Sequence, residues 1–197
     1  MKLVGTYFSP YARRVAAALI SRGIAFEHHD VNGYREFETA QLYNPIAKVP
    51  SLVLDDGEVL IDSHAILDYL NELTPAAPLI PSDSRRRRQT LRLAAIGYGV
   101  CEQTINLALR GKDVAPAVAD RWRAQVLGGL RALDQAVAGD GAPSEEPLDA
   151  AAITAIVAVE YVDRTSPGSL LSAAPALAGM ASRHADTPPF AQTRPKP

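Results

Sequence analysis

A proline-rich segment, Thr74–Ser84, divides this chain into two unlike parts. Its three prolines lack a backbone N–H and have a fixed φ, so neither a helix nor a strand continues through them. Strand and helix patterns alternate before this segment, whereas only helical patterns follow it. The sequence therefore predicts two domains: an α/β domain over residues 1–75 and an all-helical domain over residues 85–197, joined by a linker over residues 76–84.

The composition excludes several classes of protein. Apolar residues make up 47% of the chain and charged residues 21%, which is ordinary for a globular protein and excludes disorder throughout. The net charge of -2 provides no general attraction to nucleic acid or to an anionic membrane. The single cysteine, Cys101, excludes an internal disulfide and a cysteine-based zinc site. We therefore expect no metal, no nucleic-acid partner and no membrane partner.

One short apolar run, Val15–Ile20, follows two arginines and superficially resembles an export signal. It has six residues, fewer than the roughly 7–15 of a signal-peptide core. No segment approaches the roughly 20 apolar residues that span a bilayer. The sequence predicts a cytoplasmic protein.

The chain begins with the pattern of a β-α-β unit. Lys2–Phe8 reads as a strand, and apolar residues then recur at helical spacing. Ser9 is a good N-cap and Pro10 suits the first helical position. Gly23 is placed to stop this helix, and Ile24–Val31 reads as a second strand.

The remainder of the first domain predicts a hairpin and a helix. The polar segment 32–44 is irregular, with room for one short helix. The turn signal at residues 55–57 joins two short strands, 51–54 and 58–61, and a helix begins near Ser63. The order β-α-β-(α)-β-β-α suits a four-stranded sheet covered by helices.

The second domain shows helical periodicity only. Two long helices are predicted around residues 93–107 and 122–137, a third over residues 150–163, and a fourth over residues 170–184. The proline-rich tail from Pro188 is predicted to be irregular.

Three motifs resemble those of the cytosolic glutathione transferases. They are Ser-Pro-Tyr-Ala-Arg-Arg-Val at residues 9–15, Asn-Pro-Ile-Ala-Lys-Val-Pro-Ser-Leu at residues 44–52, and Asp-Ser-His-Ala-Ile at residues 62–66. The resemblance covers essentially the whole chain and is greatest to small bacterial members with a serine at the thiol position. It implies a thioredoxin-like domain followed by a C-terminal helical bundle.

Ser9 is the candidate catalytic residue. From spacing alone, a helix cap is the better explanation of this serine. The resemblance implies that its hydroxyl contacts the thiolate of glutathione, at the positive end of a helix where an anion is stabilised. Tyr7 is a rival, because many transferases use a tyrosine near the end of the first strand. A serine forms no mixed disulfide, which disfavours a thiol-disulfide reductase.

Other glutathione-binding residues follow from the resemblance. Val49–Pro50 is expected to be a cis peptide, with the Val49 backbone paired to the cysteinyl unit as in strand addition. Lys48 is placed to attract the glycine carboxylate, although a solvated loop lysine explains it equally well. Ala47 stands where relatives usually have glycine.

Asp62 and Ser63 begin a helix, where free N–H groups favour an anion. The resemblance implies that Ser63 binds the γ-glutamyl carboxylate and that Asp62 pairs with its ammonium group. Many relatives have glutamate at the Asp62 position, and an ordinary capped helix is the alternative interpretation. His28 and His29 are adjacent on a strand, so they point to opposite faces and form no ligand pair.

The resemblance also implies a pocket for the electrophile. Its candidate residues are Tyr7, Tyr11, Tyr98 and Cys101. Tyr98 and Cys101 are equally well explained as core or interface residues of the helical domain. We therefore expect a homodimeric glutathione S-transferase of detoxification type that joins glutathione, as co-substrate, to a small electrophile. The alternative is a non-catalytic glutathione-binding or protein-interaction module on the same fold.

Overall fold

A computed structural model describes residues 1–166 and 170–196. The chain forms two compact units, one containing residues 1–80 together with the segment from residue 186 onward, and the other containing residues 81–185. The sequence predicts that all residues from 85 onward belong to the helical domain. The structure instead groups the end of the chain with the N-terminal unit, and the two units are described separately below.

The N-terminal unit is built on a four-stranded sheet with the order β2-β1-β3-β4. β1 pairs in parallel with β2 and antiparallel with β3, and β3 pairs antiparallel with β4. The strands are β1 (Lys2–Val4), β2 (Glu27–His29), β3 (Ser51–Val53) and β4 (Val59–Ile61). The predicted β-α-β-α-β-β-α order and thioredoxin-like fold class are confirmed.

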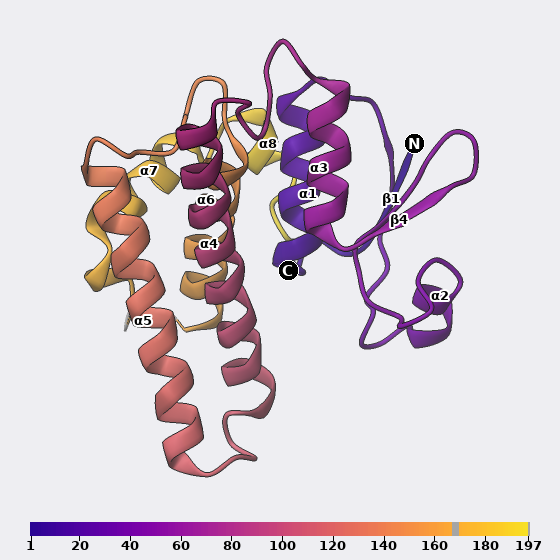
Figure 1. The fold of residues 1–197 in the computed structure, drawn as a ribbon. Helices are drawn as coiled ribbons and strands as arrows, with labels where there is room; N and C mark the ends of the chain where they lie inside the picture. The colour runs from indigo at the N-terminus through magenta and orange to yellow at the C-terminus, as the bar shows by residue number, and fades with distance from the viewer. Residues whose placement is uncertain (167–169, 197) are drawn as a thin grey trace. The chain divides into compact units, whose positions relative to one another are not determined.

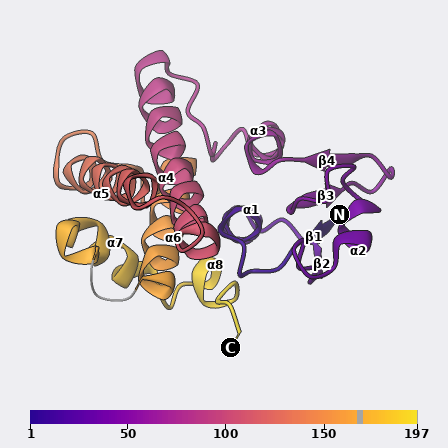
Figure 2. The same ribbon diagram turned by 90° about the horizontal axis from the view of Figure 1, so that it is seen from below.

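Helices cover both faces of this sheet (Figures 1 and 2). α1 and α3 lie on one face, and the short α2 lies on the other. The bounds are α1 (Pro10–Ser21), α2 (Phe37–Gln41) and α3 (Ser63–Leu73). Because side chains alternate along a strand, Leu3 and Val4 face opposite ways, and both are fully buried. Val4 packs with Val31 and with Ala40 of α2.

The first two strands are shorter than predicted. β1 ends at Val4 and not at Phe8, because Gly5 takes a φ of +145° and ends the extended run. The chain still follows β2 for two more residues, since Gly5 and Thr6 donate their N–H groups to the carbonyl oxygens of His29 and Val31. This bend brings the following residues to the end of the sheet.

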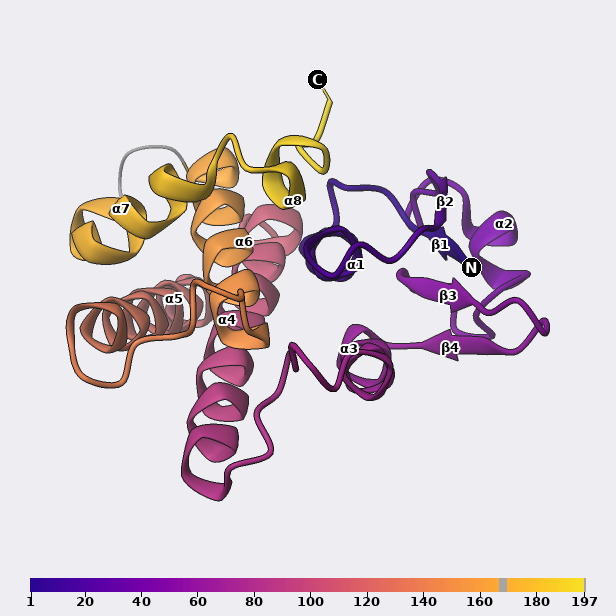
Figure 3. The same cartoon turned by 90° about the horizontal axis from the view of Figure 1, so that it is seen from above.

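The tail predicted to be irregular contains a short helix, α8 (Pro188–Ala191), that packs beside α1 (Figure 3). Arg13 of α1 is buried and donates through Nε to the carbonyl oxygen of Thr193 at 3.1 Å and through a guanidinium nitrogen to that of Phe190 at 3.5 Å. Phe190 is fully buried. These contacts explain why the tail belongs with the N-terminal unit.

The second unit is all helical, as predicted. It contains α4 (Ser84–Arg110), α5 (Pro116–Ala138), α6 (Ala150–Thr165), the 3-10 turn η1 (Leu171–Ala173) and α7 (Pro175–His184). The predicted fourth helix begins at Pro175 and not at residue 170. Asp149 caps α6, and its second carboxylate oxygen accepts from the Thr90 hydroxyl and the Ser144 N–H. Within the described residues, no helix is both long and apolar enough to cross a membrane.

Candidate functional site

Ser9 lies where the sheet passes into the first helix. It is the N-cap of α1, and Pro10 takes the first helical position, as predicted. The Ser9 Oγ accepts from the N–H of Ala12 at 3.4 Å. Within the part of the chain that the structure describes, no group accepts the hydroxyl hydrogen. This half-buried hydroxyl can therefore donate to an anion at the positive end of α1.

Gly5 allows three segments to approach one another. A Cβ built on Gly5 would lie 3.0 Å from the Cβ of Ala12 in α1 and 3.0 Å from the Cβ of Val49. Contacts this short are repulsive, and the φ of +145° also disfavours any other residue. A side chain at Gly5 would thus separate the end of β1, the start of α1 and the loop that contains Val49.

Asn44 fixes the conformation of the loop that contains Val49. Its Nδ2 donates to the carbonyl oxygen of Lys48 at 2.8 Å, and its Oδ1 accepts from the N–H of Ile46 at 3.1 Å. The Val49–Pro50 peptide is cis, as expected. In residues 1–166 and 170–196, neither the N–H nor the C=O of Val49 has a hydrogen-bond partner. This backbone can therefore pair with an extended peptide.

Ala47 and Lys48 precede Val49 in the same loop. Ala47 takes a φ of +52°, a left-handed conformation that costs an L-residue about 1–2 kcal/mol and that glycine adopts freely. Glycine, which the family resemblance leads us to expect at this position, would adopt this conformation without strain. Lys48 is exposed at the rim of the loop. An exposed lysine can reach a bound carboxylate, and the predicted contact of Lys48 with the glycine carboxylate remains a prediction.

The start of α3 carries a buried hydroxyl without a partner. The Ser63 side chain is 1% exposed, and among the described residues no group bonds to its Oγ. Asp62 has a φ of +69° and caps the helix by accepting from the N–H of His64 at 2.7 Å. An unsatisfied buried hydroxyl at a helix N-terminus is suited to a carboxylate ligand.

His64 adds a titratable group beside this position. Its Nδ1 lies 3.3 Å from a carboxylate oxygen of Asp62. Burial lowers the pKa of His64, and the charge of Arg14 lowers it further, whereas Asp62 opposes both effects. The environment therefore favours a neutral imidazole next to the predicted γ-glutamyl position.

Tyr7 points toward β2. Its ring stacks on His28 with the centroids 3.9 Å apart and an interplanar angle of 2°. Burial raises the pKa of Tyr7, and the nearby Asp30 carboxylate raises it further. A phenol with a raised pKa is a weaker hydrogen-bond donor to a thiolate, which favours Ser9 over Tyr7 for that role.

The other predicted pocket residues fall in different units. Tyr11 is half-buried on α1, whereas Tyr98 is half-buried and Cys101 is 2% exposed on α4 of the helical unit. A pocket that uses all four predicted residues remains a prediction. As predicted, His28 and His29 take different surroundings, since His29 contacts Tyr43 while His28 stacks on Tyr7.

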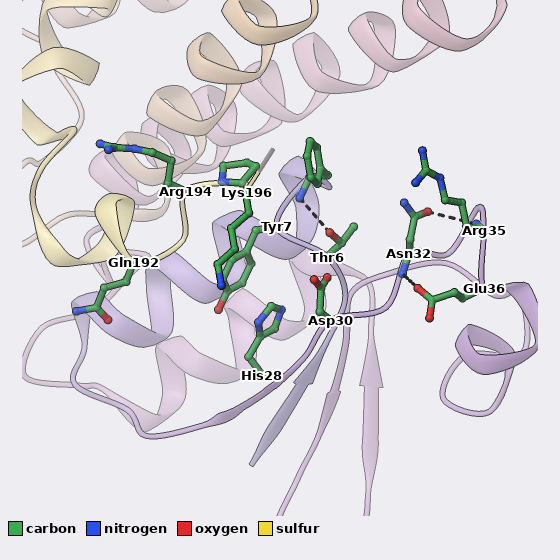
Figure 4. Close-up of a pocket in the computed structure, with 12 residues that line it drawn as sticks. Thr6, Tyr7, His28, Asp30, Asn32, Arg35, Glu36, Gln192, Arg194 and Lys196 are labelled. Atoms are coloured by element: carbon green, nitrogen blue, oxygen red, sulfur yellow. Dashed lines mark hydrogen bonds between the residues drawn. The ribbon is translucent and has the colours of Figure 1, made fainter.

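A cavity of about 610 Å³ in the N-terminal unit was missed by the sequence analysis (Figure 4). It is lined by Thr6, Tyr7, Phe8, His28, Asp30, Asn32, Arg35, Glu36, Gln192, Arg194, Pro195 and Lys196. The tail residues could not be placed from the sequence because they lie more than 150 positions from β2. The positive charges of Arg35, Arg194 and Lys196 are the features of the sequence that could have indicated this cavity.

Known proteins resemble this chain in sequence and in fold. The sequence profile of the glutathione S-transferase N-terminal domain matches residues 3–78. The crystal structure of a glutathione S-transferase from Methylobacillus flagellatus KT, with glutathione bound, has a TM-score of 0.88 with this chain at 27% identity, covering 99% of each. Residues 3–78 of this chain belong to the glutathione S-transferase family.

Other relatives differ in how much of this chain they match. The GST-like protein YibF of Escherichia coli (strain K12) is 28% identical over 174 residues, which is 85% of this chain and 86% of YibF. Maleylacetoacetate isomerase of Pseudomonas aeruginosa is 39% identical over 101 residues, or 49% of this chain and 48% of that enzyme. The chain thus spans about half the length of that isomerase.

Proposed function

We propose that this protein is a glutathione transferase that binds glutathione, ionises its thiol and transfers the sulfur to a small electrophile. Three groups without partners among the described residues support this: the hydroxyl hydrogen of Ser9, the backbone of Val49 and the hydroxyl of Ser63. Leaving a buried polar group unsatisfied costs about 1–3 kcal/mol, which a ligand recovers. The buried Ser63 Oγ is the observation that carries the proposal.

Each group has a role in holding the tripeptide. Val49 pairs with the cysteinyl unit through its N–H and C=O, and this directs the sulfur toward Ser9. Ser63 donates to the γ-glutamyl carboxylate, and Asp62 accepts from its ammonium group. Lys48 attracts the glycine carboxylate. Glutathione-bound structures of family members at comparable length support this assignment.

The chemistry follows from the ionised thiol. The Ser9 hydroxyl and the α1 dipole stabilise the thiolate, and the thiol proton passes to solvent. With an aryl chloride, the sulfur forms a bond to the ring carbon that carries chlorine, the C–Cl bond breaks and chloride leaves. Glutathione is thus a co-substrate. A homodimer, a cytoplasmic location and a detoxifying role are parts of the proposal drawn from the family resemblance.

Calorimetry with glutathione and turnover of 1-chloro-2,4-dinitrobenzene test the proposal together. We expect the wild type to bind glutathione and to turn over the aryl chloride. Ser9→Ala should keep the binding and lose about 10- to 100-fold in kcat/KM, the value of a hydrogen bond to a charged atom. Ser21→Ala, at the other end of α1, is the matched control and should match the wild type.

Two outcomes would contradict the proposal in different ways. Binding of glutathione without turnover above the uncatalysed rate would indicate the non-catalytic module. Absence of glutathione binding in the intact protein would contradict any glutathione-dependent function.

A further inference from the structure

The cavity in the N-terminal unit adjoins the proposed thiol position. Its wall includes Thr6, Tyr7 and Phe8, the three residues that precede Ser9. The Ser9 N–H donates to the carbonyl oxygen of Thr6 at 3.0 Å, so the wall and the proposed catalytic residue are held together. A molecule in this cavity is therefore next to the strand-to-helix turn that carries Ser9.

Part of this wall is aromatic and fixed. The imidazole of His28 stacks on the ring of Tyr7. Its Nε2 lies 2.8 Å from the carbonyl oxygen of Gly5. A carbonyl oxygen only accepts, so Nε2 carries the hydrogen and the ring is held in one orientation. The cavity is therefore preformed on this side.

Five charged side chains line the cavity, and two of them are already engaged. The Glu36 carboxylate accepts from the N–H of Asn32 at 2.7 Å. Arg194 pairs with Asp186 at 3.3 Å, and Asp186 is outside the lining. These two groups are therefore less available to a ligand.

The remaining three are Asp30, Arg35 and Lys196. Across the described ranges, none of these three has a charged side-chain partner within salt-bridge distance. Figure 4 shows Lys196 on the same side of the cavity as Tyr7, Arg35 on the opposite side, and Asp30 between them. Two available cations and the partly engaged Arg194 thus face one available carboxylate.

We propose that this cavity receives an anionic electrophile, so that the acceptor substrates of the protein are small molecules bearing a carboxylate. This inference rests on the proposed transferase function. A guanidinium matches a carboxylate with two parallel hydrogen bonds, and an ammonium adds a point charge. Either cation gains a charged partner that none of the described residues provides.

Asp30 carries the opposite charge and should therefore have the opposite effect on the binding of an anionic ligand. Its carboxylate repels an anionic ligand, so the removal of this charge should improve binding while the removal of a cation should weaken it. An effect of local packing would not reverse with the sign of the charge. The pair Lys196→Gln and Asp30→Asn therefore separates charge recognition from structural damage.

Two aryl chlorides of nearly equal shape provide the test: 4-chloro-3-nitrobenzoate and its neutral analogue 4-chloro-3-nitrobenzamide. The measured quantity is the ratio of their kcat/KM values, each divided by the rate constant of the uncatalysed reaction with glutathione. We expect the ratio to favour the benzoate. Lys196→Gln and Arg35→Gln should each lower it about two- to five-fold, and Asp30→Asn should raise it by a similar factor.

Binding provides an independent measurement that needs no turnover. The glutathione conjugates of the two compounds can be compared by calorimetry, and the carboxylate conjugate should bind more tightly. The preference should shrink as the salt concentration rises from about 0.05 M to about 0.5 M, because these cations are exposed to solvent. Lys2→Gln removes a cation from the far end of β1 and should leave the ratio unchanged.

The failures of the two proposals are distinguishable. A ratio near one that is unaffected by the three cavity variants would overturn this inference while leaving the transferase function intact. Loss of binding for glutathione itself and for both conjugates would instead contradict the proposed function.

Discussion

The rings of Tyr7 and His28 lie parallel with their centroids 3.9 Å apart, which fixes the Tyr7 phenol against the edge strand β2. Burial and the neighbouring Asp30 carboxylate raise the pKa of this phenol. A tyrosine so placed is a poor replacement for the Ser9 hydroxyl as a donor to sulfur. The two neighbouring hydroxyl groups therefore differ in how well each could donate to a thiolate, because burial and Asp30 raise the pKa of Tyr7.

Tyr7→Phe should leave the pKa of bound glutathione unchanged, because the proposed function assigns the contact with the sulfur to Ser9 and not to Tyr7. The pH dependence of kcat/KM with 1-chloro-2,4-dinitrobenzene reports this pKa. The stack with His28 survives in the variant, so it should fold normally. An upward movement of the pH profile would assign the thiolate contact to Tyr7.

Ser63→Ala should have opposite effects on binding and stability. The buried hydroxyl has no partner among the described residues, so its removal should keep or slightly raise the melting temperature of the free protein. The affinity for glutathione should fall about ten-fold, since a charge-assisted hydrogen bond is lost. Calorimetry and thermal melts check both effects. An unchanged affinity would remove Ser63 from the binding site.

Arg13→Met should release the tail from α1. The substitution leaves the carbonyl oxygens of Phe190 and Thr193 without their buried donor. We expect a loss of about 2–3 kcal/mol in the free energy of unfolding and faster hydrogen exchange at residues 188–194. Arg85→Met, on the exposed start of α4, is the control. Unchanged exchange in the tail would contradict the role of Arg13.

Glu145 should make the helical unit less stable in acid. Burial alone would raise its pKa, but hydrogen bonds from Arg183 and His184 outweigh burial and lower the pKa below the ordinary value of 4.5. A lowered pKa gives stability that is present above 4.5 and lost as the pH falls through the folded-state pKa. Glu145→Gln should therefore destabilise by up to about 1 kcal/mol near neutral pH and by less near pH 3. Urea unfolding at both pH values measures this, and an equal loss at both would contradict it.

Local signals were sufficient to predict most of the fold. Ser9 and Pro10 mark the start of α1 because capping and a fixed φ act within one turn. The proline-rich segment separates the two units for the same kind of reason. By contrast, β1 ends early because Gly5 must approach Ala12 and Val49, a contact between segments distant in the sequence.

The sequence could predict only those residues of the site that belong to a family motif. Ser9, Val49 and Ser63 lie in motifs shared with a family, so the sequence alone is enough to propose their roles. The cavity residues His28, Arg35 and Lys196 belong to no such motif. Lys196 lies near the other two because Arg13 holds the tail against α1, and no local pattern encodes that contact.

The pKa of glutathione bound to the wild type and to Ser9→Ala tests the central claim most directly. The ultraviolet absorbance of the thiolate, titrated with pH in the complex, reports it. The wild type should hold the thiol pKa below its ordinary value of about 8.5, and Ser9→Ala should raise it by about 1 to 2. Equal thiol pKa values in the two complexes would contradict the account.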